Sequence, residues 1–203
     1  MRRWLLGIGV ALMVLPGCKK GEEDPFFTLR SRKQRLTGSW ELETYERNLN
    51  VGKIRQVTFS SDDGLTYLFE DSSQVSRAFT WTISFNNDGE YRSEEREEFP
   101  ADSSSGDQPF TYITEQNGAW KFTGGNDVPN RSQLILLVEE IAIQQTDLGS
   151  NIQIETFSDP IEGKVYTIDR LSHEELWLSY AVRRATPFTE ELDSLVVKFR
   201  KDL

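Results

Sequence analysis

The sequence predicts an all-β protein in which an antiparallel sheet buries one of its faces. Apolar and polar residues alternate with a period of two along most of the chain, most clearly where Phe79, Trp81, Ile83 and Phe85 alternate with small polar residues. Clusters of Asn, Asp and Gly separate such stretches, and no long helical period lies between them, which argues against βαβ units. About ten short strands joined by hairpins can protect their edges by closing into an up-and-down barrel or by folding over as a sandwich.

The first residues have the pattern of an export signal. Arg2 and Arg3 precede an apolar run from Trp4 to Leu15, which is too short to span a bilayer. The run ends in Leu15-Pro16-Gly17-Cys18, which resembles the lipobox of bacterial lipoproteins, in which the Cys is lipidated and becomes the mature N-terminus. We therefore expect residues 1–17 to be a lipoprotein signal peptide and Cys18 to be the lipid attachment site. The alternatives are an ordinary signal peptide with an incidental Cys, or a short membrane anchor.

Residues 18–27 are expected to be a tether between the lipid anchor and the folded domain, because Lys19 to Asp24 are almost all charged. This stretch also resembles the acidic signals that some Bacteroidota lipoproteins carry for display on the cell surface, and a plain solvated linker is the alternative. The expected location is the cell envelope, as an outer membrane lipoprotein on the periplasmic face or the cell surface. The membrane is then a partner only through the anchor at Cys18.

Residues 28–203 are expected to form one β-barrel domain that opens with a short helical turn, with Thr28 as its N-cap and Gly38 as its stop. The first strand is expected to contain Trp40, Leu42 and Thr44 on one face, alternating with Glu41, Glu43 and Tyr45 on the other. A strand is also expected around Val57 to Phe59, and another contains Phe79 to Phe85. Further strands are expected at Leu65–Glu70, Gly89–Phe99, Phe110–Gln116, Gly118–Thr123, Gln133–Ile143, Asn151–Phe157, Val165–Leu171, Glu175–Val182 and Ser194–Lys201.

Three short segments are expected to reverse the chain. Asn86 to Gly89 and Gln116 to Gly118 contain residues that tolerate positive φ in hairpin turns. The segment from Leu171 to Leu176 is expected to be the third reversal of the chain. The most loop-like region is Pro100 to Pro109.

Gly38-Ser39-Trp40 resembles the Gly-x-Trp motif that opens the first strand of lipocalins. The wider arrangement, from the lipobox to the Tyr166-Thr-Ile-Asp-Arg-Leu-Ser stretch, is similar to lipocalin-like lipoproteins of Bacteroidota. This resemblance implies a single antiparallel up-and-down β-barrel of the lipocalin type, with Gly38 and Trp40 as a structural motif at its closed end. It also implies that Arg200 on the last strand stacks on Trp40.

Composition and motifs do not favour an enzyme. A formal charge of −10 argues against nucleic acid as a partner, and a single Cys prevents an internal disulfide. His173, the only His, falls in an expected surface turn, and no catalytic or cofactor-binding motif occurs, so we expect no cofactor and no metal. The carboxylate-rich run from Glu94 to Glu98 is expected to be a solvated hairpin that protects a sheet edge.

Two functions remain open. The resemblance implies a cup that binds or carries a small hydrophobic molecule. The alternative is a filled barrel that docks on another envelope protein or on a glycan. Trp81, Trp120 and Trp177 are compatible with a pocket or with a filled core, so no ligand-binding residue is assigned from the sequence.

Overall fold

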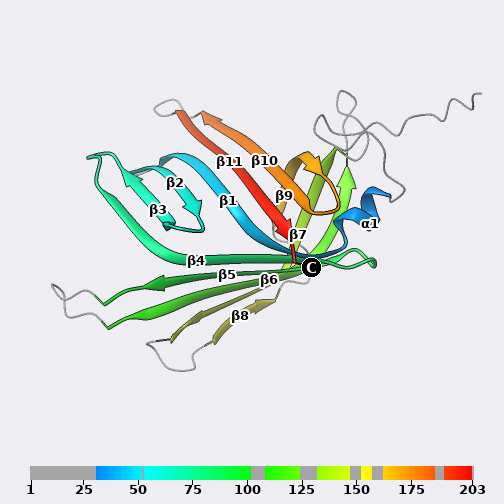
Figure 1. Ribbon diagram of the computed structural model, residues 1–203, viewed down its shortest axis with the longest axis horizontal. Helices are drawn as coiled ribbons and strands as arrows, with labels where there is room; N and C mark the ends of the chain where they lie inside the picture. The colour runs from blue at the N-terminus through cyan, green and yellow to red at the C-terminus, as the bar shows by residue number, and fades with distance from the viewer. Residues whose placement is uncertain are drawn as a thin grey trace, which may run out of the picture.

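A computed structural model describes residues 31–51, 53–101, 108–123, 132–146, 152–156, 162–185 and 190–202. This part of the chain contains one short helix and eleven strands (Figure 1). The elements are α1 (Arg32–Leu36), β1 (Gly38–Val51), β2 (Ile54–Ser60), β3 (Gly64–Phe69), β4 (Gln74–Phe85), β5 (Glu90–Phe99), β6 (Phe110–Thr123), β7 (Gln133–Gln145), β8 (Ile152–Thr156), β9 (Glu162–Leu171), β10 (Glu175–Ala185) and β11 (Glu190–Lys201).

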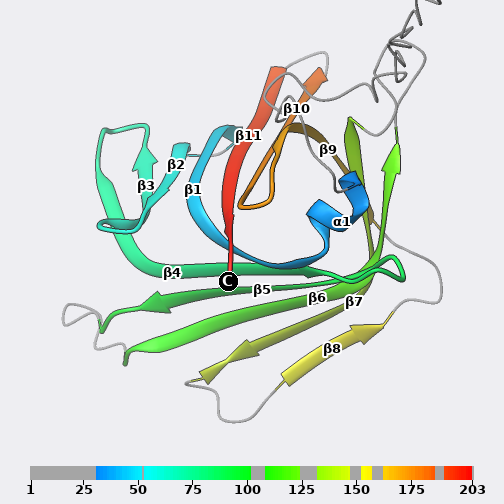
Figure 2. The same ribbon diagram turned by 45° about the vertical axis from the view of Figure 1, so that its right-hand side comes forward.

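The strands form a closed antiparallel up-and-down barrel, which confirms the predicted fold class. Ten strands make the ring, in the order β6-β5-β4-β3-β2-β1-β11-β10-β9-β7, and β6 pairs with β7 to close it. β8 lies outside the ring, on the same edge of β7 that pairs with β9 farther along the strand (Figure 2). The barrel is lipocalin-like in this sense: sequential strands are neighbours and enclose one interior.

The barrel has a narrow end and a wide end. At the narrow end the first residues of β1 pair directly with the last residues of β4, from Gly38↔Phe85 to Glu41↔Thr82. Farther along, β1 leaves β4 and pairs with β2, so that the β2–β3 hairpin is inserted between β1 and β4. The ring therefore gains two strands toward the wide end.

α1 packs at the narrow end and begins with a capping box. The Ser31 hydroxyl accepts from the Gln34 backbone N–H, and the Gln34 side chain accepts from the Ser31 N–H. Ser31 is thus the N-cap, and the expectation of a cap at Thr28 was wrong. The Ser-x-x-Gln spacing of residues 31–34 was itself the signal for this cap. Leu36, at the end of α1, is fully buried in the core.

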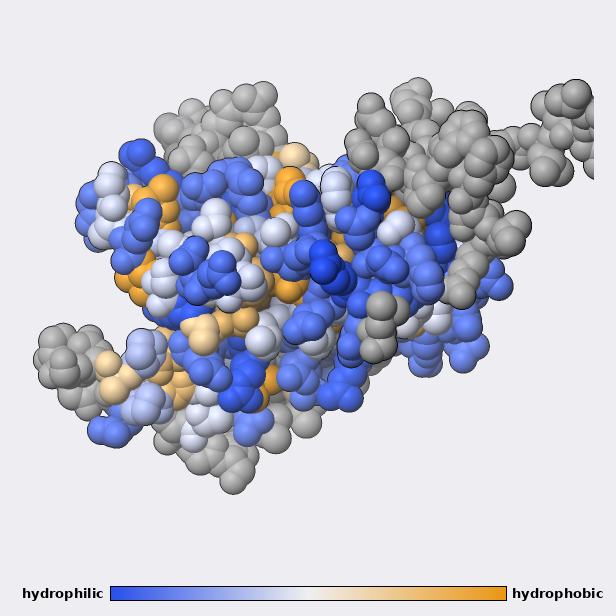
Figure 3. All heavy atoms as spheres, in the orientation of Figure 1, coloured by the Kyte–Doolittle hydropathy of each residue, from blue (hydrophilic) through white to orange (hydrophobic). Residues whose placement is uncertain are grey.

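Apolar side chains fill the narrow half of the barrel. They form one cluster around Trp40, with Ile83 and Phe85 facing inward as predicted and with Phe79 and Trp81 packed against the cluster. The other fully or almost fully buried members include Leu134, Ile168, Leu171, Leu176, Leu178, Val197 and Phe199. Hydrophilic side chains cover most of the face drawn in Figure 3, and hydrophobic ones surface in separate small patches, one of them around the β2–β3 hairpin.

The predicted turn at Gln116 to Gly118 was wrong, because β6 runs through it as one strand. A bulge in the neighbouring strand explains this. β7 carries one extra residue, Glu139, between the pairs Asn117↔Glu140 and Gly118↔Val138. A Cβ on Gly118 would lie 2.0 Å from the Leu137 carbonyl oxygen. This glycine therefore permits a close backbone approach across the bulge instead of turning the chain.

Lys201, and not Arg200, lies against the tryptophan of the Gly38-Trp40 motif. The Lys201 Nζ is 4.8 Å from the centre of the Trp40 ring, and it donates to the backbone oxygens of Arg35 (3.0 Å) and Thr37 (2.6 Å). Arg200 faces the outside and pairs with Glu43 at 2.5 Å. The expected stacking of Arg200 on Trp40 was therefore wrong. Side chains alternate along β11, so that Val197, Phe199 and Lys201 share its inner face and Arg200 points outward.

Gly38→Ala should destabilise the barrel by about 1 to 3 kcal/mol. Gly38 has a φ of 124°, which a residue with a Cβ rarely adopts, and the added Cβ would lie 2.7 Å from Lys201 Cε, so the lysine side chain would also have to shift. Urea unfolding followed by tryptophan fluorescence measures the loss. Gly163→Ala is the matched control, since its Cβ would meet only the Leu137 side chain at 3.3 Å. An unfolding midpoint for Gly38→Ala equal to that of the control would contradict the role of this glycine.

Candidate binding cavity inside the barrel

The wide half of the barrel contains a cavity of about 180 Å³. Side chains from eight strands line it, which places it in the barrel interior above the apolar cluster. The lining residues are Tyr45, Arg47, Trp81, Ile83, Tyr91, Ser93, Glu95, Gln116, Leu136, Val138, Lys164, Tyr166, Tyr180 and Leu195. The barrel is therefore filled at its narrow end and hollow farther up. Pockets for drug-sized molecules measure about 300 to 1,000 Å³, so an occupant of this cavity would be smaller.

A bulge in β1 decides which residues of that strand reach the cavity. The pairs Leu42↔Phe199 and Thr44↔Lys198 leave Glu43 as an extra residue. The alternation therefore reverses: Trp40 and Leu42 face inward below the bulge, and Tyr45 and Arg47 line the cavity above it. Thr44, which was expected on the face of Trp40, is exposed.

Aromatic rings form much of the cavity wall. Trp81 makes edge contacts with Phe199 below it and with Tyr45, at centroid distances of 5.0 and 6.3 Å. Tyr166 and Tyr180 make a similar contact at 5.7 Å on the opposite part of the ring. Burial raises the pKa of the Tyr166 phenol and raises that of Tyr180 to about 12, so both phenols are neutral at physiological pH.

One charged pair in the cavity is fully engaged. The Arg47 guanidinium donates to both carboxylate oxygens of Asp193, at 2.9 and 2.8 Å, in the bidentate geometry that suits this pair. The Tyr180 hydroxyl also donates to Asp193, at 3.2 Å. The hydrogen bond to Asp193 is the main cause that raises the pKa of Arg47. The pair adds no net charge to the cavity.

Three charged or amide side chains of the lining have no such partner. Glu95, Gln116 and Lys164 make no hydrogen bond and no ion pair with any residue that the structure describes. Lys164 nevertheless acts on Glu95 electrostatically and lowers its pKa, as does Arg47. Burial is the larger effect, and it raises the pKa of the Glu95 carboxyl above the usual value.

The position of Glu95 corrects the expectation of a solvated hairpin at Glu94 to Glu98. β5 lies between β4 and β6 and is not an edge. Its inner face carries Tyr91, Ser93, Glu95 and Glu97, because side chains alternate along the strand. Glu97 is engaged by Arg77 at 2.7 Å and by the Tyr67 hydroxyl at 3.0 Å.

A second, larger hollow lies at the wide end. It measures about 440 Å³ and is lined by residues that flank the ends of β4, β5 and β6. Phe99 and Phe110 stack there at 4.4 Å, with the Arg77 guanidinium 4.1 Å from the centre of the Phe99 ring. Residues 102–107, which adjoin it in sequence, lie outside the described part of the chain.

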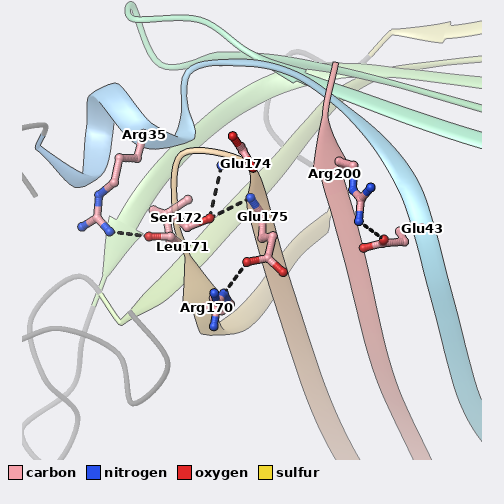
Figure 4. A network of polar contacts seen from close by, with 8 residues as sticks. All are labelled: Arg35, Glu43, Arg170, Leu171, Ser172, Glu174, Glu175 and Arg200. Carbon is pink, nitrogen blue, oxygen red and sulfur yellow. Dashed lines mark hydrogen bonds and ion pairs between the residues drawn. The ribbon is translucent and has the colours of Figure 1, made fainter. Parts of the chain in front are cut away.

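Hydrogen bonds and one ion pair fasten the turn between β9 and β10. Figure 4 shows the Arg35 guanidinium donating to the Leu171 carbonyl, and Ser172 Oγ accepting from the N–H groups of Glu174 and Glu175. Arg170 pairs with Glu175 at 2.7 Å. The predicted reversal from Leu171 to Leu176 is confirmed, and His173 is exposed within it.

The three tryptophans considered for the interior have different positions. Trp120 is buried in the core, and Trp81 lines the cavity. Trp177 is on the outer face, between the Arg170 guanidinium at 5.2 Å and the Lys198 ammonium at 4.1 Å, so it lines neither core nor pocket. Leu176 and Leu178, on either side of Trp177 in β10, are buried in the interior, so the alternation of side chains places Trp177 on the outer face.

The sequence-predicted site residues are only partly within this region. Gly38 and Trp40 sit together at the narrow end, below the cavity, and Cys18 lies outside the described residues. Within the described residues, no group of three or more His, Cys, Asp or Glu is arranged to hold a metal ion. A membrane-spanning helix is likewise not found among them.

Comparisons with protein-family models, with curated proteins and with solved structures gave no match to this chain.

Glu95→Gln should stabilise the unliganded protein at pH 7 and lose this advantage as the pH falls to 4. Because the folded protein raises the pKa of Glu95, ionising it costs stability once the pH rises above the ordinary value of 4.5. At lower pH the carboxyl is protonated in both the folded and the unfolded state, and the cost is absent. Urea midpoints of wild type and variant at several pH values measure the difference. Glu94→Gln, which faces outward from the same strand, controls for the loss of one carboxylate.

Proposed function

We propose that this protein is a cell-envelope lipoprotein whose barrel binds or carries a small molecule with a hydrophobic body. The observation that supports binding is the interior cavity, whose lining combines aromatic rings with charged and other polar side chains. The observation that supports the location is the segment ending in Leu15-Pro16-Gly17-Cys18. A lipid anchor there would hold the barrel at the outer membrane without a membrane-binding surface of its own.

Protein purified without harsh extraction should carry a small molecule in stoichiometric amount, detected by native mass spectrometry. Leu195→Phe adds a ring to the cavity wall and should remove the bound molecule, because the volume available is small. Val196→Phe is the matched control, since Val196 follows in the same strand and points outward with 44% exposure. Thermal unfolding verifies that both variants are folded. If a folded wild type carries no small molecule and binds none, the alternative of an interaction module that docks on an envelope protein or glycan is favoured.

Cys18→Ala should abolish lipidation and leave the signal segment uncleaved. Cys18 is the only thiol in the chain, so palmitate label incorporated into the wild type has no other cysteine to enter. Metabolic labelling with palmitate, followed by electrophoresis, measures both label and processing. Pro16→Ala serves as the control, because Ala is a more usual residue before the Gly of a lipobox and label should be retained. Undiminished label in Cys18→Ala would show that the lipobox interpretation is wrong.

A further inference from the structure

The cavity holds two opposite charges that do not contact each other. Glu95 comes from β5 and Lys164 from β9, with β6 and β7 between them in the ring. They interact through space without forming an ion pair. The other charged pair of the cavity, Arg47 with Asp193, already satisfies itself with two hydrogen bonds. Glu95 and Lys164 are therefore the charged lining groups that remain available to a ligand.

A ligand with one charge would leave one of these groups without a counter-charge. Partly buried charges are costly unless a partner of opposite sign or a hydrogen bond compensates them. A molecule with an ammonium and an anionic group compensates both Glu95 and Lys164. It also adds no net charge to the cavity, in which the charges of Glu95, Lys164, Arg47 and the neighbouring Asp193 already sum to zero. Gln116, whose side-chain amide makes no hydrogen bond within the described residues, can donate to one end of such a molecule or accept from the other.

The aromatic wall fits the same ligand. Trp81 is directly opposite Glu95 in the β4–β5 pairing, so an ammonium beside the carboxylate would also lie near the indole ring. On the β9 side, Tyr166 follows Lys164 on the same inward face of the strand. The two charges are thus separated by a wall of Leu136, Val138 and aromatic rings, which suits an apolar body between or beside the charged groups.

We propose that the cavity selects a small zwitterion with an apolar or aromatic body, its ammonium bound at Glu95 and its anionic group bound at Lys164. This inference rests on the proposed small-molecule binding function and narrows it to a ligand class.

Four probes that share a phenyl body but differ in charge test the proposal. These are phenylalanine as the zwitterion, 3-phenylpropanoate as the anion, 2-phenylethylamine as the cation and 3-phenylpropanamide as the neutral molecule. Calorimetric titration of the mature lipidated protein in detergent micelles at neutral pH, with empty micelles as the blank, gives their affinities. Phenylalanine should bind at least about tenfold more tightly than each of the other three, as expected when a charge-assisted hydrogen bond is lost.

Two variants connect the preference to the two charges. Glu95→Gln should weaken phenylalanine binding by about tenfold or more and leave the affinity for 3-phenylpropanoate equal or higher. Lys164→Met should also weaken phenylalanine binding, and it should leave the affinity for 2-phenylethylamine equal or higher. Glu94→Gln and Lys121→Met are the controls, because each removes one charge of the same sign from an outward-facing position on β5 or β6. These two variants should bind the probes with the affinities of the wild type. Thermal unfolding confirms that each variant is folded.

The outcomes separate this inference from the function on which it rests. If all four probes bind equally, or if the neutral probe binds most tightly, the cavity does not select a zwitterion, and the proposed small-molecule binding function still stands. Loss of affinity in the two outward-facing controls as large as in the cavity variants would also overturn it. If no probe binds and native mass spectrometry finds no bound molecule, the proposed function fails together with the inference.

Discussion

One lysine joins the beginning and the end of the barrel. The Lys201 ammonium, on the last strand, donates to the carbonyl oxygens of Arg35 and Thr37, which flank the end of α1, and lies over the Trp40 ring of the first strand. An ammonium in such a place requires acceptors, and the ring face offers it a further attraction. The Trp40 indole N–H in turn donates to the Leu36 carbonyl at 2.7 Å. The position of the helix and the packing of the narrow end depend on this set of contacts.

Bulges then determine what the barrel encloses. In a regular strand, Trp40 would put residues 42, 44 and 46 on its own face, but the extra residue Glu43 brings Tyr45 and Arg47 inward instead. The extra residue Glu139 in β7 has a similar effect, and Gly118 opposite it leaves room for the distorted backbone. Beyond the β1 bulge, that strand contributes Tyr45 and Arg47 to the interior in place of apolar side chains such as Trp40 and Leu42.

The mixed character of the cavity has a physical consequence. Arg47 and Asp193 neutralise each other through a bidentate contact and are positioned by Tyr180, which makes them part of the wall. Glu95 and Lys164 come from different strands, β5 and β9, and form no ion pair with each other, so both charges still face the cavity.

The sequence by itself determined the fold class, most strand positions, the inward face of Phe79 to Phe85 and the turn at Asn86 to Gly89, because alternation and turn chemistry are local properties. It also singled out Gly38 and Trp40 as a pair. Only the tertiary structure decided that Lys201 reaches Trp40, that residues 116–118 continue a strand, and that Glu95 and Lys164 share a cavity. These features depend on register and on bulges, where a shift of one residue moves every following side chain to the other face. The residue pattern of a single strand does not show such a shift, because the shift depends on how that strand pairs with its neighbour.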